Sequence, residues 1–193
     1  MEILIRNEVK RKAIHLFALS IPIGYCFVPQ YYALLILVPI SLFSLAIDLF
    51  RILELPGHRF FIYIFGPMLR DHEEADLTGG SYILFASTVC IAIFSKPVAL
   101  AAMGFIILGD ISSALIGRNL GKISLGNKTL EGSLGFFISC LLVIVIIPEF
   151  NLIIGLLGAF LATALEAIDT PIDDNLLVPV ISGLVMQTLL EIS

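Results

Sequence analysis

The sequence predicts an all-α integral membrane protein, a polytopic bundle of about seven transmembrane helices. The first observation is composition: of the 193 residues, 59% are hydrophobic and 14% are charged, whereas a soluble domain carries about 25% charged residues. The second is continuity, because the apolar residues form unbroken runs that do not alternate as barrel strands do. We therefore expect one transmembrane domain over residues 1–193, with the bilayer and not nucleic acid as its partner.

The expected helices follow from the positions of the apolar runs. A spanning helix needs about 20 residues, within a range of about 17–25, so the third or the sixth run is short enough to be re-entrant. The first run follows a basic cluster, as in a signal peptide. No small-residue cleavage site leads into a polar domain, so we expect a retained helix. The runs are 13–28, 31–50, 79–95, 97–117, 133–148, 152–168 and 175–190.

The basic residues predict the orientation. If successive helices alternate in direction, ten of the 11 Lys and Arg residues fall on the N-terminal side, and Lys96 falls on the other. Cytoplasmic loops carry the excess of Lys and Arg. We therefore expect a cytoplasmic N-terminus, a C-terminus outside and a site at the cytoplasmic face. The ten residues are Arg6, Lys10, Arg11, Lys12, Arg51, Arg59, Arg70, Arg118, Lys122 and Lys128.

The start of the first run carries ionisable residues on one helical face, at Glu8, Arg11, Lys12 and His15. An ordinary positive-inside anchor explains the cations. It does not explain Glu8 in the same cluster, or His15 inside the apolar run. Ionisable groups within a membrane are costly and usually face a bundle interior or a wet cavity. This segment alone leaves both a functional role and an anchor open.

Residues 55–78 differ from the spanning runs, because aromatic and aliphatic residues are mixed with charges at both ends. The segment is too short and too interrupted to cross a bilayer, so we expect an interfacial amphipathic helix. Such a helix either guides a lipid tail into the site or lies at the headgroup level without a further role.

The fourth run carries an acid, Asp110, beside a ridge of small residues. Gly109, Ser113 and Gly117 recur every four residues, a spacing that lets two membrane helices approach closely. A charge about two turns from the helix end is costly unless it binds a cation or a partner. Asp110 is therefore either a functional acid or half of an ion pair with Arg11, Lys12 or Arg118.

The loop over residues 117–132 combines glycines with cations. Glycines expose backbone N–H groups and permit positive φ, which suits a loop around phosphates. The loop is not a P-loop, since GRNLGKI is one residue short of GxxxxGK[ST] and ends in Ile. Lysine supplies charge, and arginine can bind phosphate through two N–H groups. The expected nucleotide-binding residues are Gly117, Arg118, Gly121, Lys122, Lys128 and Gly132, with Gly126 in the same loop.

Acidic groups also flank the last two runs. Gly158, Ala162 and Glu166 recur every four residues, so we expect Glu166 to point into the bundle. A second group lies at the start of the seventh run, where one member is expected to serve as a helix N-cap. Such an oxygen-rich group suits Mg²⁺, which needs hard ligands and bridges to substrate phosphates. Its members are Asp169, Asp173, Asp174 and Asn175.

These residues together predict the class of chemistry. Acids that hold Mg²⁺, with cations and amides that hold phosphates, are the inventory of phosphoryl or nucleotidyl transfer. The spanning runs leave no soluble domain, so we expect the other substrate to lie in the membrane. The residues alone predict a metal-dependent transferase acting on a lipid. The expected metal ligands are Asp110, Glu131, Asp173, Asp174 and Asn175.

Three segments resemble landmarks of the polyprenol kinase family, which includes dolichol kinases, phytol kinases and fungal-type diacylglycerol kinases that use CTP. The landmarks occur in the family's order and extend from Glu8 to Val180. The segments KTLEGS and DDNLLVP look closest to the dolichol kinase branch. The landmarks are EVKRKAIH, then GDISSALIGRNLGK with KTLEGSLG, then EAIDTPIDDNLLVPV.

The resemblance implies a Mg²⁺-dependent kinase that moves the γ-phosphate of CTP onto an isoprenoid or related lipid alcohol. It adds Thr129 to the expected nucleotide-binding residues. Asp110 either accepts the proton of the lipid hydroxyl or binds the metal, and His15 and Glu166 are expected near the lipid. Positions that match those needed for activity in the family are Arg11, Lys12, Asp110 and Gly117.

Other functions stand as alternatives. The block from Lys128 to Gly132 also resembles phosphatidate cytidylyltransferases, which likewise use CTP and Mg²⁺. Buried acids in seven helices also permit a transporter or channel. Against a transporter, the charges gather at one face and the outer half is nearly apolar. A purely structural membrane subunit would leave the glycine-rich loop unexplained.

Overall fold

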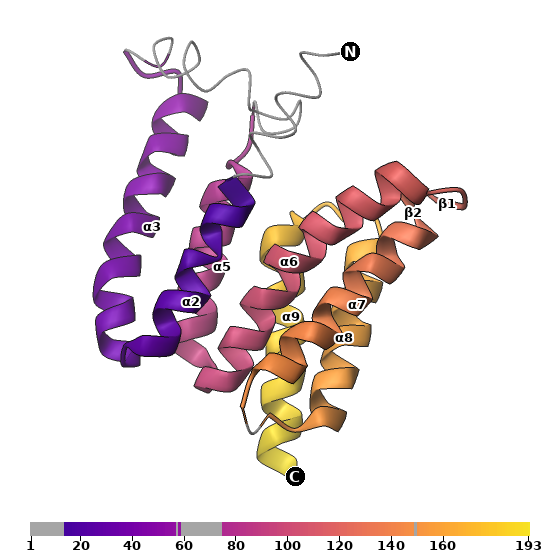
Figure 1. Cartoon of the computed structure of the whole chain (residues 1–193). Coiled ribbons are helices and arrows are strands. Elements are labelled where there is room, and N and C mark those ends of the chain that lie inside the picture. The colour runs from indigo at the N-terminus through magenta and orange to yellow at the C-terminus, as the bar shows by residue number, and fades with distance from the viewer. Residues whose placement is uncertain (1–13, 57, 59–74, 149) are drawn as a thin grey trace.

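A computed structural model of the chain describes residues 14–56, 58, 75–148 and 150–193. The described residues form helices that lie side by side in one bundle, so the all-α prediction is confirmed (Figure 1). The one exception in the described part is a short antiparallel pair, β1 (Ser124–Leu125) and β2 (Lys128–Thr129). The helices are α2 (Ser20–Phe27), α3 (Gln30–Ile52), α5 (Gly79–Ile93), α6 (Lys96–Leu120), α7 (Leu130–Ile146), α8 (Leu152–Ala167) and α9 (Asp174–Ile192).

Three described helices, α3, α6 and α9, are long and apolar enough to cross a membrane. The other apolar helices have 10–17 residues, and the first of them extends α2 back to Ile14. Helices α5 and α8, the third and sixth runs, are among these shorter helices, so whether they span or re-enter the membrane stays open. The protein is therefore a membrane protein by its helices, while the count of seven spans and the orientation stay predictions.

Helix α6 is the centre of the bundle. It packs against α2, α5, α7, α8 and α9, and its middle is buried throughout, with Val98, Phe105 and Ile107 fully inaccessible. By contrast, the outer helices present large apolar side chains outward, such as Phe27 and Phe160. An outward apolar surface of this kind is favourable against lipid. Asp110 lies on this central helix and is partly buried.

Small residues let α6 and α7 pack closely. A Cβ atom added at Gly109 would lie 2.5 Å from the Phe136 ring, and one at Gly132 would lie 3.0 Å from the Ser113 carbonyl oxygen. Both distances are too short for a side chain without movement of the neighbour. The predicted ridge of small residues is therefore a helix–helix contact, and it fixes where the loop between α6 and α7 emerges.

At the end of the bundle near the C-terminus, polar side chains complete helix ends. The Lys96 ammonium donates to the carbonyl oxygens of Cys26 and Val28, at 3.0 and 3.1 Å. The Gln30 amide donates to the Ile91 carbonyl oxygen at 2.7 Å. Carbonyl groups at helix C-termini lack partners within the helix, so these bonds satisfy them. We call this end the capping end.

Candidate functional site

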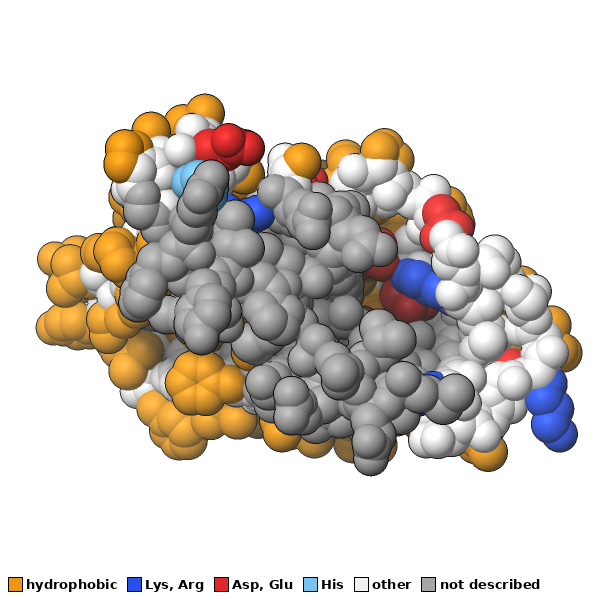
Figure 2. All heavy atoms as spheres, turned by 90° about the horizontal axis from the view of Figure 1, so that it is seen from above, with side chains coloured by type: hydrophobic (Ala, Val, Ile, Leu, Met, Phe, Trp, Pro, Cys, Tyr) orange, Lys and Arg blue, Asp and Glu red, His pale blue; other side chains and the backbone are white. Residues whose placement is uncertain are grey.

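Most charged residues of the described chain, with Lys96 and Glu191 as exceptions, lie at the other end of the bundle, which we call the charged end. Helices α3, α6 and α8 end there, and α5, α7 and α9 begin there (Figure 1). Figure 2, which views this end, shows acidic side chains at the bottom of a hollow with a basic side chain beside them. Of the basic residues that the structure describes, Arg51, Arg118, Lys122 and Lys128 belong to this end and Lys96 to the other. Which end faces the cytoplasm stays a prediction.

Lys128, on β2, contacts the end of α8 and the start of α9. Its Nζ lies 2.7 Å from Asp174 Oδ2 and 3.2 Å from Glu166 Oε1, and it also donates to the Glu166 carbonyl oxygen. The hairpin that presents Lys128 turns at Gly126, whose φ of 60° favours glycine. Asn127 fastens the same turn by donating to Asp169 at 3.1 Å. The Lys128 ammonium group thus lies between two carboxylates, one from α8 and one from α9.

The charge of Lys128 is held by its partners. Partial burial alone would lower the pKa of this ammonium, because desolvation disfavours the charged form. The carboxylates of Glu166 and Asp174 outweigh that effect and raise the pKa above its ordinary value of 10.5. Lys128 is therefore a fixed positive charge at neutral pH.

Glu166 is the buried anion of this group. Only 4% of the residue is exposed, which confirms the prediction that it points into the bundle. Its Oε1 accepts a hydrogen bond from the Ser113 hydroxyl on α6 at 3.0 Å. Its Oε2 is buried and has no hydrogen-bond partner among the described residues. A buried carboxylate with one free acceptor oxygen is costly, so Glu166 is a candidate for more than packing.

Asp110 contacts the first helical stretch. Its Oδ2 lies 3.0 Å from Nδ1 of His15, a residue that is buried against the bundle. Its charge also interacts electrostatically with Asp174 at the start of α9. The expected partners Arg11 and Lys12 lie outside the described residues, so the catalytic roles predicted for them stay predictions. His15 is thus inside the bundle as expected, and the structure adds it as a partner of Asp110.

Asp173 and Asn175 form the start of α9. Asp173 Oδ1 accepts hydrogen bonds from the backbone and side-chain nitrogens of Asn175, each at 2.8 Å. Asp173 is therefore the predicted helix N-cap. The Asn175 amide nitrogen is engaged in that cap and the residue is buried. Asp174, one residue on, faces Lys128 instead.

The glycines of the loop over residues 117–132 have a packing role. Thr129 caps α7 by accepting from the Gly132 backbone N–H at 3.1 Å. A Cβ atom added at Gly117 would lie 2.8 Å from the Thr129 hydroxyl oxygen, and Gly121 is also tight against Thr129. These contacts explain the glycines, because the end of α6 packs closely against the start of α7 at these positions. Their role in binding phosphate stays a prediction. Arg118 and Lys122, predicted for the same role, are exposed.

Glu131 has a different environment from the other acids. Its Oε2 accepts from the Ile123 backbone N–H at 3.3 Å, beside the hairpin. The structure therefore brings Asp110 to His15, and Glu131 to the hairpin. That both acids face one metal ion stays a prediction.

No group of three or more His, Cys, Asp or Glu side chains in the described residues is arranged to hold a metal ion. The donor type nevertheless suits Mg²⁺, because Asp110 and Asp174 are hard oxygen ligands at one end of the bundle. This ion is commonly bound by one or two carboxylates and completed by substrate phosphates and water. A pre-formed cage of acids is thus not required for Mg²⁺ to bind with a nucleotide.

A pocket of about 310 Å³ opens beside this group. Its wall comes from the α8–α9 connection and from one residue that precedes α5. Four of its residues are aspartates, so the pocket has a strongly negative lining. The lining residues are Asp76, Ile168, Asp169, Thr170, Pro171, Ile172, Asp173 and Asp174.

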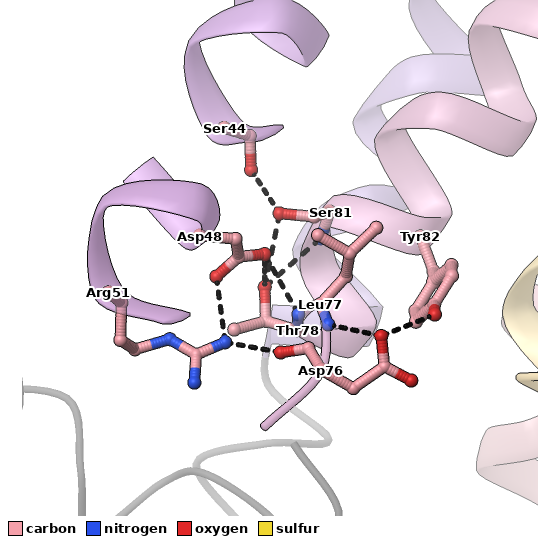
Figure 3. Close-up of polar contacts among 8 residues, drawn as sticks. All are labelled: Ser44, Asp48, Arg51, Asp76, Leu77, Thr78, Ser81 and Tyr82. Atoms are coloured by element: carbon pink, nitrogen blue, oxygen red, sulfur yellow. Dashed lines mark hydrogen bonds and ion pairs between the residues drawn. The ribbon is translucent and has the colours of Figure 1, made fainter. Parts of the chain in front are cut away.

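A further polar cluster, absent from the predicted site, lies between α3 and α5 (Figure 3). Asp48 and Arg51 are buried on α3 and form an ion pair, with Asp48 Oδ1 3.3 Å from Arg51 Nη2. Sequence reasoning counted Arg51 as a loop cation and passed over Asp48. The signal was present, since an acid inside an apolar run with a cation three residues later shares one helical face. Most of the interfacial segment expected over residues 55–78 lies outside the described residues.

Comparisons with known proteins point to lipid phosphorylation. The chain is 27% identical over 182 residues to an uncharacterised protein of Rickettsia prowazekii, covering 89% of each. It is 26% identical over 155 residues to the CTP-dependent diacylglycerol kinase 1 of Schizosaccharomyces pombe, covering 68% of this chain and 69% of the kinase. The chain is similar to lipid kinases.

A third relative, the CTP-dependent diacylglycerol kinase 1 of Eremothecium gossypii, is 26% identical over 177 residues. That match covers 77% of this chain and 56% of the kinase. No family model matches the chain, and no solved structure does. The polyprenol kinase resemblance is thus supported at the level of a related lipid kinase, whereas the dolichol branch receives no support from these relatives.

Proposed function

We propose that the protein is a CTP-dependent lipid kinase that transfers the γ-phosphate of the nucleotide to the hydroxyl of a membrane lipid. The observation that carries the proposal is Lys128, a permanent cation held between Glu166 and Asp174 where the α6–α7 hairpin meets the α8–α9 connection. Similarity to two CTP-dependent diacylglycerol kinases supports the nucleotide and the lipid class. In this proposal the charged end faces the cytoplasm and the protein crosses the bilayer several times.

Lys128 would bind the triphosphate together with the exposed cations Arg118 and Lys122. Its three N–H donors already face oxygen acceptors, so a phosphate oxygen would replace one of them. Positive groups arranged before the reaction stabilise charge that develops on the transferred phosphoryl group. Arg11 and Lys12 are proposed for the same role from the N-terminal segment.

Asp110 and Asp174 would hold Mg²⁺, which supplies positive charge to the phosphates when bound. Asp173, Asn175 and Glu131 are proposed as outer members of this group, because each already makes a hydrogen bond within the fold. Glu166 lies deeper and keeps Lys128 in place.

The acceptor lipid would place its hydroxyl near Asp110. In the transfer, the lipid oxygen forms a bond to the γ-phosphorus, the bond from that phosphorus to the β-bridging oxygen breaks, and CDP leaves. The hydroxyl proton passes to a carboxylate, for which Asp110 is suited by its contact with His15. Diacylglycerol and isoprenoid alcohols both present one hydroxyl on apolar tails, so either class fits this description.

Transfer of label tests the proposal. Purified protein in lipid vesicles would receive CTP labelled at the α or the γ phosphate, with Mg²⁺ and one of three lipids: diacylglycerol, an isoprenoid alcohol or phosphatidate. We expect γ label in the lipid, and none from the α position. Lipid labelled from the α position would instead establish a cytidylyltransferase, and an absence of labelled lipid with CTP and with ATP would overturn the kinase proposal.

A further inference from the structure

The Asp48–Arg51 pair is unusual for its place. It lies on α3, a helix long and apolar enough to span a membrane, and only 1% of Asp48 and 3% of Arg51 is exposed. Ionisable groups within such helices are expensive and usually mark a functional region. A buried ion pair contributes little net stability, because the loss of hydration offsets the attraction. We therefore look for the role of this ion pair in the way it positions the residues that it contacts.

The pair holds the segment that leads into α5. Asp48 Oδ2 accepts from the Thr78 backbone N–H at 2.8 Å and from the Thr78 hydroxyl at 3.1 Å. Arg51 Nη2 donates to the Asp76 carbonyl oxygen. Two residues of this segment, Asp76 and Thr78, are thus tied to α3, one by each member of the ion pair (Figure 3).

Asp76 is the residue that this arrangement presents to the pocket. Its Oδ1 accepts from the Leu77 backbone N–H at 2.6 Å and from the Tyr82 hydroxyl at 2.9 Å. Figure 3 shows its second carboxylate oxygen directed away from these donors. Asp76 lines the same pocket as Asp173 and Asp174, and the Tyr82 hydroxyl interacts electrostatically with Asp173. The N-terminal half of the bundle thus contributes a wall to the proposed site.

We infer that Asp76 belongs to the nucleotide site and binds the sugar or base, and that Tyr82, Asp48 and Arg51 are positioning residues for it. The inference rests on the proposed function. The pocket lies at the α8–α9 connection, outside the apolar helix middles, so it suits the water-soluble substrate rather than the lipid tail. Carboxylates repel a triphosphate but accept hydrogen bonds from ribose hydroxyls and from the cytosine amino group.

The test compares steady-state constants for Asp76→Asn, Tyr82→Phe and wild type in vesicles. Asn keeps an acceptor for Leu77 and Tyr82, but it replaces the second carboxylate oxygen by a donor. We expect the KM for CTP to rise about 10-fold in Asp76→Asn and less in Tyr82→Phe, since a hydrogen bond to a charged group is lost. The KM for the lipid and kcat should change less than about threefold.

Nucleotide analogues identify the group that Asp76 binds. The KM values of 2′-deoxy-CTP, 3′-deoxy-CTP and UTP would be measured with wild type and with Asp76→Asn. The analogue that lacks the contacted donor should bind both enzymes equally. If Asp76→Asn raises the KM by the same 10-fold for every analogue, Asp76 does not form a direct hydrogen bond with the sugar or base.

The positioning role has its own variants. Arg51→Gln should raise the KM for CTP, and Arg51→Lys, which keeps the positive charge that pairs with Asp48, should restore part of the affinity. Ser44→Ala is the matched control, because the Ser44 hydroxyl contacts the Ser81 hydroxyl on the side of the cluster away from Asp76 (Figure 3). Unfolding temperature in detergent would be measured for all variants.

The outcomes separate the two proposals. An active wild type in which Asp76→Asn leaves the KM for CTP unchanged, or raises the KM for the lipid instead, overturns this inference and leaves the kinase proposal intact. A wild type that transfers phosphate from no nucleotide overturns the kinase proposal itself. Equal changes in KM for Ser44→Ala and Arg51→Gln would overturn the positioning role.

Discussion

The two ends of the bundle use polar side chains in different ways. At the capping end, Lys96 and Gln30 donate to carbonyl oxygens that the helices leave without partners. At the charged end, ionisable side chains instead face one another, as Lys128 faces Glu166 and Asp174, and Asp110 faces His15. The first arrangement completes backbone hydrogen bonding. The second places charges of both signs around a hollow. Bringing these charges together costs free energy, and the fold alone does not require it.

This difference teaches where to look for function in a membrane protein. A cation that caps a helix end is explained by the fold, and its removal should affect stability. A cation between two partly buried carboxylates can exchange one of them for a phosphate, and its removal should affect chemistry. Substitutions at the two ends should therefore separate activity from stability.

The largest effect is expected for Asp110→Asn. The substitution keeps an acceptor oxygen for the contact with His15 but removes the negative charge, so the fold should persist. Loss of a proton acceptor or metal ligand lowers rates by about 10²–10³-fold. The measurement is the rate of lipid phosphorylation per folded molecule. Glu191→Gln, which neutralises an acid at the capping end, should keep full activity. Equal losses of activity in Asp110→Asn and Glu191→Gln would contradict the difference between the two ends of the bundle.

Glu166→Gln should have a smaller effect on rate, about 10-fold, because Lys128 remains but is held less well. Without the Glu166 charge, burial is opposed mainly by Asp174, so the pKa of Lys128 should fall below its wild-type value and the alkaline limb of the pH–rate profile should move to lower pH. In the wild type, the paired carboxylates raise the pKa of Lys128 above 10.5. The stability that this pairing gives the fold is therefore complete below pH 10.5, and it is lost only as the pH rises through the raised pKa. An unshifted profile would show that Glu166 does not act through Lys128.

Gly109→Ala should lower stability by about 1–3 kcal/mol, because its Cβ would press on the Phe136 ring between α6 and α7. Gly24→Ala on α2 is the matched control, since no atom lies within 4 Å of the added Cβ. Alanine favours a helix over glycine, so the control should be neutral or slightly stabilising. Thermal unfolding in detergent measures both, and a control that falls as far as Gly109→Ala would refute the steric account.

The smallest effect is expected for Gln30→Ala at the capping end. It removes bonds to the Ile91 and Ala92 carbonyl oxygens, worth about 1 kcal/mol of stability. The rate of lipid phosphorylation should stay within a factor of two. A loss of activity larger than the loss of folded protein would mean that the capping end also takes part in the reaction.

The sequence predicts those features that depend on one segment at a time. Helical spacing correctly placed the small ridge around Gly109 against a neighbouring helix, and it correctly turned Glu166 inward. The local pattern before α9 correctly indicated a cap, which is Asp173. Each of these outcomes is decided by the face or the end of a single helix.

Pairings across the bundle were not predictable in the same way. Lys128 meets Asp174 although 46 positions separate them, and Asp76 meets Arg51 across the connection between α3 and α5. Helical periodicity shows which face a residue occupies but not which neighbour packs against that face. The Asp48–Arg51 pair was detectable within α3, whereas its effect on Asp76 required the fold.

The most direct test exchanges one lysine at each end for methionine, which keeps the length of the side chain and removes its charge. Lys128→Met and Lys96→Met would be prepared together in vesicles, and transfer of γ label from CTP to lipid would be measured per folded molecule. The account predicts a fall of about 100-fold or more for Lys128→Met, with Lys96→Met within about twofold of wild type and less stable to heat. Full activity in Lys128→Met, or equal losses in both variants, would contradict the claim that the charged end carries the reaction.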